Sequence, residues 1–308
     1  MSSALPCSTC TERGLQIISY LLAPLQYEFF QHALVSALIV GCLCGFVGAY
    51  VVLRKMSYVG HGLSHAVLGG GVLGYVLGIN FYIMAGLWGF LAALAIDAIA
   101  RKRRVGADAA IGVVTMAAFA FGVVLISRGR SFARNFEAAL FGNVLGVTNT
   151  DIIIIGLAAA LVLVLCTVLY RQLLFLTFDP EVAPVYGVRQ GIVDALFSLM
   201  LAGTIIVSAQ IMGVTLIAAA LVTPAVVARF LTSSFRVMLG LSTFFGGVSG
   251  LLGVFLSYYL DAASGATIVL TAAGMFVIAY AAFLLRERAE IRRGMSRSRP
   301  ALPAFPDE

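Results

Sequence analysis

The sequence contains few charged residues: 11% of its 308 residues are Asp, Glu, Lys or Arg, against 61% that are hydrophobic. A soluble globular domain is about half apolar and about a quarter charged. The mean hydropathy is +1.03, and apolar runs of about 20 residues, long enough to cross a hydrocarbon core of about 30 Å, recur along nearly the whole chain. The composition therefore excludes a soluble or merely anchored protein and places the chain in the lipid bilayer.

Two further signatures are missing from the sequence. No phosphate-binding loop of the form G-x-x-x-x-G-K-[ST] occurs in it, so this chain is not expected to be an ATPase, and any ATP hydrolysis must come from another subunit. The residues before the first long apolar run lack both a basic start and a small-residue cleavage site. We therefore expect no removable signal peptide.

The net charge of +6 is concentrated in basic clusters beside the apolar runs, at residues 101–104 and 286–299. Such clusters mark the cytoplasmic side of a membrane protein, so they do not indicate a nucleic-acid partner. Alternation from these clusters predicts an external N-terminus, a cytoplasmic C-terminus and a cytoplasmic position for Arg54, Lys55, Arg171, Arg229 and Arg236. Three arginines in the loop 128–134 fall on the external side, and the topology does not explain them.

Apolar windows between charged residues predict an all-α fold, a polytopic bundle of about nine transmembrane helices. The predicted spans are 32–54, 57–79, 83–100, 109–127, 150–170, 191–210, 212–231, 237–260 and 266–285. The run 15–25 is too short to cross and contains Pro24, which favours an interfacial piece. The run 136–147 is apolar but short, as in a half-helix or re-entrant element.

Polar groups inside predicted spans are costly and therefore point to function. His61 and His65, two of only three histidines, lie four residues apart in the second span with Ser64 beside them. On a helix this spacing stacks both imidazoles on one face, where they could share a metal ion. A metalloprotease helix would need Glu directly after the first histidine, and Gly62 stands there. Metal binding and simple hydrogen bonding to neighbouring helices both remain possible.

Two other features carry weaker signals. Pro224 interrupts an apolar run, and the partly polar segment that follows it, up to Arg236, is either a helix presented to a soluble partner or an ordinary connecting turn. Cys7 and Cys10 form a C-x-x-C pair, but no second pair completes a zinc site and its role stays open.

At these residues the sequence resembles the permeases of ATP-binding-cassette importers for manganese, zinc and iron, the ABC-3 type. The matching pieces occur in family order and span residues 27–285. They are Phe46–Arg54, Met56–Gly70, Asp108–Gly112, Phe178–Ala183 with Gly187, Gly213 with Leu221–Ala225, and Ser264–Val269. The resemblance implies a type II importer permease fold, with an extracellular or interfacial segment (1–31), a transmembrane permease domain (32–285) and a basic cytoplasmic tail (286–308).

The resemblance also implies partners and a location. These are an ABC ATPase subunit, an extracellular metal-binding lipoprotein and a second permease copy, with a homodimer as the default, in the bacterial plasma membrane. A coupling region at about 224–236 would dock on the ATPase. Its predicted contact residues are Pro224, Ala225, Arg229, Ser233 and Arg236.

One departure from the family pattern concerns the metal. The family commonly has Gly-Asp-x-x-Ser-His at this motif, and here His61 stands where the aspartate would be. Carboxylate suits manganese, whereas imidazole also suits zinc and iron, so the substitution weakens the inference to manganese. Ser64, Gln210 and Thr223 are further candidate ligands.

The sequence therefore predicts a permease that imports a divalent metal, Mn²⁺ or Zn²⁺ or Fe²⁺, by alternating access, with no permanently bound cofactor. The alternatives are a secondary transporter or channel that needs no ATPase, a membrane metalloenzyme, and a permease of the same fold that carries a metal chelate. Uptake by the chain alone would identify the first of these alternatives.

Overall fold

The computed structural model describes residues 23–100, 107–127, 140–142, 144–179 and 182–297, and all structural statements refer to these residues. They contain helices and no β-strand. The long helices are α2 (Glu28–Leu53), α3 (Ser57–Leu77), α4 (Phe81–Ala100), α5 (Ala107–Ser127), α7 (Asn149–Val168), α9 (Gln190–Met212), α10 (Ile217–Leu231), α11 (Phe235–Leu260) and α12 (Ser264–Arg297). Short elements are η1 (Ala23–Gln26), η2 (Val144–Gly146), α8 (Tyr170–Phe178) and η3 (Ala183–Tyr186).

The helices confirm the predicted all-α membrane fold. In the described residues, six helices are long and apolar enough to cross a bilayer, and the apolar segments Phe81–Ile96 and Ile217–Leu231 are shorter. Each of the nine predicted spans corresponds to one long helix. The predicted tail begins inside α12, which continues as helix to Arg297. The segment containing Cys7 and Cys10, the basic cluster 101–104 and the loop 128–134 lie outside the described residues.

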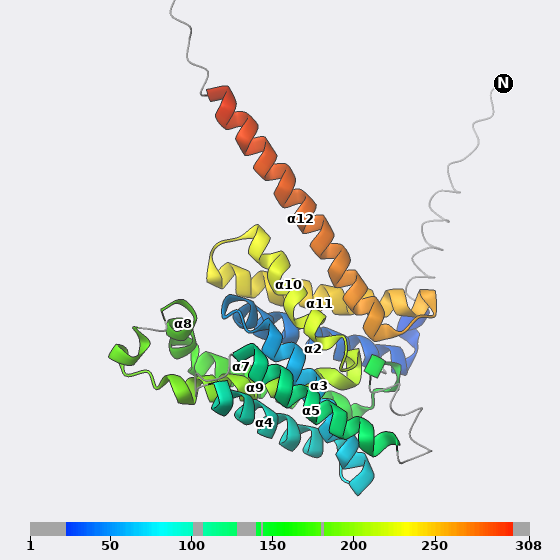
Figure 1. Cartoon of the computed structure of the whole chain (residues 1–308). Helices are drawn as coiled ribbons and strands as arrows, with labels where there is room; N and C mark the ends of the chain where they lie inside the picture. Colours follow the sequence, from blue (N-terminus) through cyan, green and yellow to red (C-terminus); the bar gives the residue numbers. More distant parts are fainter. Residues whose placement is uncertain (1–22, 101–106, 128–139, 143, 180–181, 298–308) are drawn as a thin grey trace, which may run out of the picture.

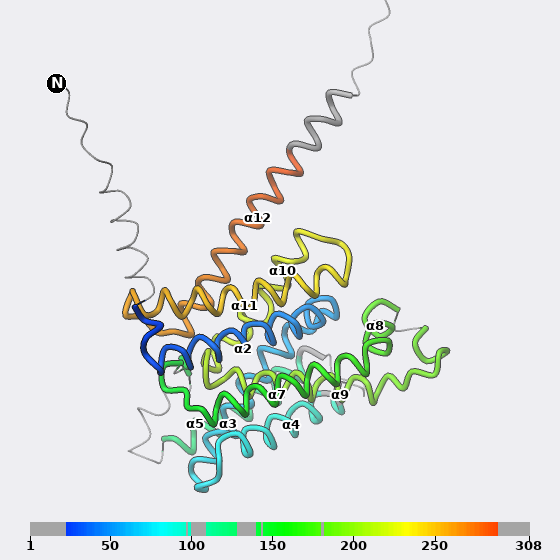
Figure 2. Tube along the Cα trace, turned by 180° about the vertical axis from the view of Figure 1, so that it is seen from behind, coloured from blue at the N-terminus to red at the C-terminus, as the bar shows by residue number. Residues whose placement is uncertain are grey.

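The helices pack in two groups. In the first group α2 packs against α10 and α11, and α12 packs on α10 and α11 before its C-terminal part leaves the bundle (Figure 1). In the second group α3 packs against both α4 and α5. Helix α9 contacts members of both groups, and it lies between α7 and α4 (Figures 1 and 2). The predicted metal helix, α3, is therefore held inside the bundle.

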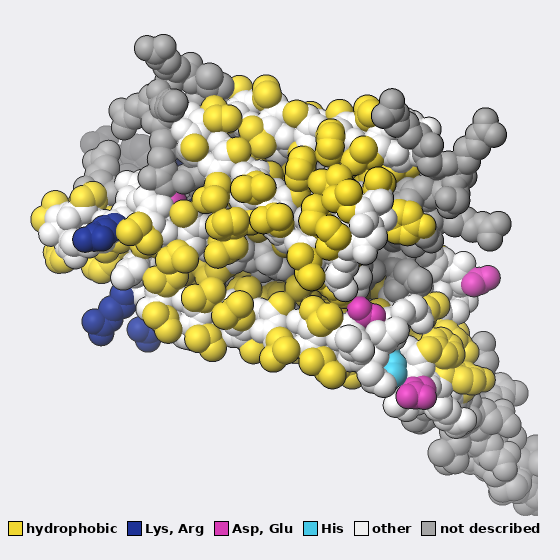
Figure 3. All heavy atoms as spheres, turned by 90° about the horizontal axis from the view of Figure 1, so that it is seen from below, with side chains coloured by type: hydrophobic (Ala, Val, Ile, Leu, Met, Phe, Trp, Pro, Cys, Tyr) yellow, Lys and Arg dark blue, Asp and Glu magenta, His cyan; other side chains and the backbone are white. Residues whose placement is uncertain are grey.

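Charge separates the two ends of this bundle. The described basic side chains gather at the end where α2 meets α3 and where α10 meets α11, and the other end carries Glu28, Asp151 and Asp261. Figure 3 shows basic side chains at one end of a flank that is otherwise mostly hydrophobic. We call these ends the basic end and the acidic end. A hydrophobic flank between two charged ends is the form expected of a protein that spans a bilayer.

The chain breaks between α9 and α10 at Gly213, not at Pro224. Gly213 has a φ of +78°, and a Cβ built on it would lie 2.3 Å from the Leu140 carbonyl oxygen. Only glycine avoids both the strain and this clash. The prediction that Pro224 breaks its helix was wrong: Pro224 is buried inside α10, which continues to Leu231. Neighbouring helices can satisfy the backbone group that proline leaves free in a membrane.

Candidate metal site

The first turns of α3 bring His61 and His65 together. Their ring centroids are 4.9 Å apart and the ring planes are perpendicular, at 89°. Spacing of four residues on a helix produces this proximity, because it returns a side chain to nearly the same face. The predicted pair is therefore present as a pair of neighbouring imidazoles, close to the basic end of the bundle.

The two imidazoles differ in their surroundings. His65 is half-buried, with its ring 5.3 Å from the Phe119 ring of α5, and its Nδ1 atom is buried without a hydrogen-bond partner among the described residues. His61 is exposed. A buried polar atom without a partner is costly, and a neutral imidazole nitrogen is a common metal ligand. The pair thus combines a buried His65 nitrogen that has no hydrogen-bond partner among the described residues with an accessible His61 ring.

Ser64 is adjacent in sequence but already engaged. Its side chain is fully buried, and its Oγ donates a hydrogen bond to the His61 carbonyl oxygen at 2.7 Å. Such a bond to the preceding turn is common for serine in a helix. Ser64 therefore shapes the first turns of α3, and its hydroxyl proton is not available to another acceptor.

The two other candidate ligands lie elsewhere. Gln210 is near the end of α9 at the acidic end, where its side chain is hydrogen-bonded to the Tyr82 hydroxyl. Thr223 lies in the middle of α10. With a rise of 1.5 Å per residue, Gln210 is on the order of 20 Å from the histidines along the bundle. The structure thus brings together His61, Ser64 and His65, but not Gln210.

The histidine pair does not make a complete metal site within one chain. No group of three or more His, Cys, Asp or Glu side chains that could hold a metal ion occurs in the described residues. Metal ions in proteins take four or more ligands. The exposed side of α5 next to this pair offers room, because Met116 is 52% exposed and a Cβ on Gly112 would meet nothing within 4 Å.

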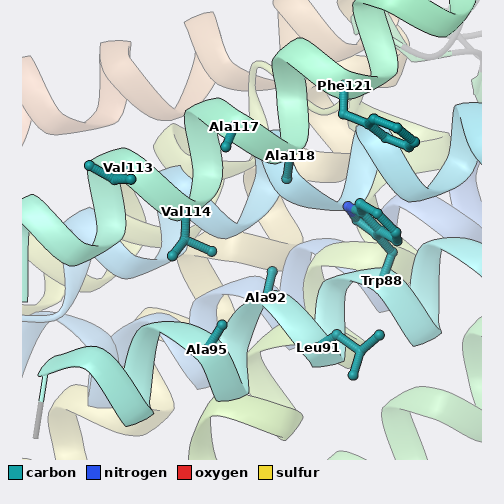
Figure 4. A pocket seen from close by; sticks show the side chains of 9 residues that line it. All are labelled: Trp88, Leu91, Ala92, Ala95, Val113, Val114, Ala117, Ala118 and Phe121. Atoms are coloured by element: carbon teal, nitrogen blue, oxygen red, sulfur yellow. The ribbon is translucent and has the colours of Figure 1, made fainter.

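An apolar groove runs between α4 and α5 on a different face. Its volume is about 520 Å³ and Figure 4 shows its lining side chains, Trp88, Leu91, Ala92, Ala95, Val113, Val114, Ala117, Ala118 and Phe121. Ala117 and Phe121 are each two residues from Phe119, which on a helix places them about 160° away from it. The groove therefore opens away from the histidines, and it carries no side-chain metal ligand.

The predicted coupling residues divide into buried and exposed ones. Pro224 and Ala225 are buried in α10 and so cannot form part of a docking surface. Arg229, Ser233 and Arg236 are exposed around the turn between α10 and α11, at the basic end.

Sequence reasoning missed two polar contacts in the bundle. Arg54, at the end of α2, forms a largely buried ion pair with Asp194 in α9. Tyr82, in the first turn of α4, is hydrogen-bonded to both Asp151 and Gln210. Polar residues at predicted helix ends were a signal for both, but their partners are far away in the sequence.

Comparison with known proteins decides the family. The ABC 3 transport family matches residues 26–283, most of the chain. The chain belongs to this family. The resemblance predicted from the motifs is confirmed, and the protein is a membrane-spanning permease.

Curated relatives of the permease carry metal names. It is 40% identical to the "manganese transport system membrane protein MntC" of Halalkalibacterium halodurans over 259 residues, 83% of this chain and 88% of the relative. It is 38% identical to the "probable iron transport system membrane protein" of Haemophilus influenzae over 272 residues, 88% of this chain and 100% of the relative.

A solved structure supports the fold. The permease superimposes on PsaBC from Streptococcus pneumoniae, solved in complex with Fab, with a TM-score of 0.79 and 36% sequence identity. The match covers 85% of this chain and 95% of that chain.

Proposed function

We propose that this permease imports a divalent transition metal, Mn²⁺ in the first place, and that His61 and His65 bind the ion in transit. The observation that supports this best is the buried, unpartnered Nδ1 of His65 beside the exposed ring of His61. Relatives named for manganese transport favour the same cargo. Two imidazoles on one helix hold a cation weakly enough to release it, whereas a closed tetrahedral site would trap it.

A second copy of the chain completes this site in our proposal. A two-fold axis beside α3 brings the identical surface of the second copy against this pair, so further ligands come from across the interface and the ion is released when the two surfaces separate. His61 is exposed in the single chain and is therefore accessible to a second copy. An ABC ATPase subunit completes the importer, because this chain has no nucleotide-binding loop. Membership of the ABC 3 transport family favours an external metal-binding lipoprotein as a further partner.

The nitrogen at position 61 leaves zinc and iron as competing cargoes. Imidazole binds Zn²⁺ and Fe²⁺ more tightly than Mn²⁺, which has the lowest intrinsic affinity of the three. The relative from Haemophilus influenzae that is named for iron transport supports Fe²⁺ as a competing cargo. Selectivity for manganese then depends on geometry and on what the external lipoprotein delivers.

The basic end faces the cytoplasm in our proposal, within the bacterial plasma membrane. Positive residues favour the cytoplasmic side, and Arg54, Lys55 and Arg171 lie at this end. The N-terminus is then external and the C-terminus cytoplasmic. The ATPase docks here, on Arg229, Ser233 and Arg236, and on the strongly exposed η3, where Val185 is 84% exposed.

Metal uptake into liposomes tests this function. The chain is reconstituted with its ATPase, metal is supplied on the external side as Mn²⁺, Zn²⁺ or Fe²⁺, and uptake is measured with and without ATP. We expect ATP-dependent Mn²⁺ uptake that His65→Ala reduces at least about tenfold, since a ligand is lost. His61→Asp should raise the preference for Mn²⁺ over Zn²⁺, because a carboxylate oxygen replaces a nitrogen.

The third histidine provides a matched control. His32 lies in the first turns of α2 at the acidic end, 3.9 Å from Glu28, away from the proposed site. His32→Ala should leave uptake unchanged. Equal uptake by wild type and His65→Ala would remove His65 from the site, and uptake without the ATPase would establish a secondary transporter.

A further inference from the structure

Three helices meet in a polar cluster at the acidic end of the bundle. The Tyr82 hydroxyl, in the first turn of α4, donates a hydrogen bond to Asp151 Oδ1 of α7 at 2.8 Å. The same hydroxyl is hydrogen-bonded to the side-chain amide of Gln210, near the end of α9. All three side chains are half-buried. One tyrosine therefore links three helices that are far apart in the sequence.

The cluster has a consistent set of donors and acceptors. A hydroxyl carries one proton, so it cannot donate to both partners. The structure places Gln210 Oε1 on this hydroxyl. When the hydroxyl donates to Asp151, a half-turn of the Gln210 amide presents its nitrogen as the donor to the Tyr82 oxygen, because the two ends of an amide have nearly the same shape. Asp151 Oδ2 accepts from the Thr148 amide at 3.0 Å and from its hydroxyl at 2.6 Å, in a capping box.

The polar atoms of this cluster are engaged mainly with one another. Both oxygens of Asp151 already accept hydrogen bonds, and the Gln210 amide is engaged with Tyr82. Three donors, the Tyr82 hydroxyl and the amide and hydroxyl of Thr148, thus hold the Asp151 carboxylate in place. Gln210, a predicted metal ligand, is hydrogen-bonded to Tyr82 in this structure and so joins helices here.

The position of the cluster explains what it restrains. Helices α4 and α7 each pack along α9, which lies between them (Figures 1 and 2). The Tyr82–Asp151 bond joins the two outer helices across the end of α9. Gln210 adds a bond to α9 itself, three residues before Gly213, which caps the helix. Separation of any of the three helix ends must break a bond to Tyr82.

We propose that Tyr82, Asp151 and Gln210 form a clasp that keeps the acidic end of the permease closed and must open for metal to enter. The role in entry rests on the proposed function, because alternating access requires the external end to open and close. The three are positioning residues and do not bind the metal. A hydrogen bond to an ionised carboxylate is strong enough that its loss shifts a closed–open equilibrium by about tenfold or more.

Cysteine reactivity measures this opening without metal or ATP. Val147, 9% exposed and one residue before Thr148, becomes a reporter at the acidic end as Val147→Cys. Val193, 2% exposed near the start of α9, reports on the basic end as Val193→Cys. The full complex is treated with a maleimide, and the alkylation rate of each reporter follows the fraction of time its site is open.

We expect Tyr82→Phe to raise the alkylation rate at position 147 about tenfold and to leave the rate at position 193 unchanged. Tyr258→Phe is the matched control, since it removes the same atom near the end of α11, also at the acidic end. Asp151→Asn keeps the size and one acceptor oxygen of the side chain, and it should give a smaller increase than Tyr82→Phe. It also covers the case in which Tyr82→Phe does not fold.

Three results would overturn the clasp: an unchanged rate at position 147, an equal rise at positions 147 and 193, or the same rise in Tyr258→Phe. An equal rise at both positions would show that the substitution loosens the whole bundle and not the acidic end alone. The ratio of metal imported to ATP hydrolysed should also fall in Tyr82→Phe. Absence of uptake in wild type would refute the proposed function while the labelling result still decided the clasp.

Discussion

Among single residues, Arg54 and Asp194 form a contact that could not be predicted from their positions in the sequence. Their side chains are 9% and 22% exposed and form an ion pair, and the Arg54 guanidinium also lies 4.7 Å from the centre of the Phe197 ring. The two residues that Arg54 contacts, Asp194 and Phe197, are both in α9. The pair therefore anchors the turn that leads into α3, three residues before the helix that carries the histidines begins.

Removal of one partner should destabilise the permease strongly. Asp194→Ala leaves a buried arginine without its counter-charge, which typically costs about 3–5 kcal/mol in folding free energy. The measurement is the thermal unfolding midpoint of the purified permease in detergent. Asp179→Ala is the control, because Asp179 is exposed at the same end, and it should change the midpoint little. Equal midpoints for both variants would contradict a structural role for the pair.

At the scale of elements, close helix crossings organise the first group of helices. Helices α2 and α11 cross so closely that a Cβ built on Gly41 would lie 2.3 Å from the Gly246 carbonyl oxygen, and one on Gly246 would lie 2.2 Å from the Gly41 carbonyl oxygen. Lipid does not drive helices together, so packing through small residues must. A glycine in a sequence does not say which helix it meets, so the identity of each crossing partner required the structure.

A bulky side chain at this crossing should force the helices apart. Gly41→Leu is expected to cost at least about 2 kcal/mol of stability, because the obstacle is backbone and cannot rotate away. Gly156→Leu in α7 is the control, since a Cβ there would meet nothing within 4 Å, and a better helix former should be neutral or stabilising. The comparison uses thermal unfolding in detergent. A tolerated Gly41→Leu would show that this crossing is looser than its geometry indicates.

The whole molecule has a polarity that can be tested directly. The five native cysteines are first replaced. Single cysteines are then placed at Ser233, exposed between α10 and α11, and at Ala262, exposed between α11 and α12. With the basic end in the cytoplasm, an impermeant maleimide added outside should label Ala262→Cys and not Ser233→Cys. Ser233→Cys should be labelled from the cytoplasmic side and protected when the ATPase is bound. Reversed labelling would invert the topology, and labelling without protection would move the docking surface elsewhere.

The sequence by itself determined the class of this protein and the position of its helices. An apolar run of membrane length indicates by itself that the segment crosses the bilayer, and this inference needs no knowledge of tertiary contacts. The His61–His65 pair was equally predictable, because a spacing of four residues on a helix defines proximity without any other element. The family motifs were sufficient to predict the class of transporter, because each motif is a short segment that can be recognised from the sequence alone.

The tertiary structure decided everything that depends on pairs of residues distant in the chain. It placed Gln210 with Tyr82 and Asp151 and away from the histidines, and it paired Arg54 with Asp194. It also showed that Pro224 stays inside a continuous helix and that the turn between α9 and α10 depends on Gly213, because the cost of each residue depends on the backbone packed against it. Helical periodicity says which side chains share a face, but only the packing of helices says which faces meet.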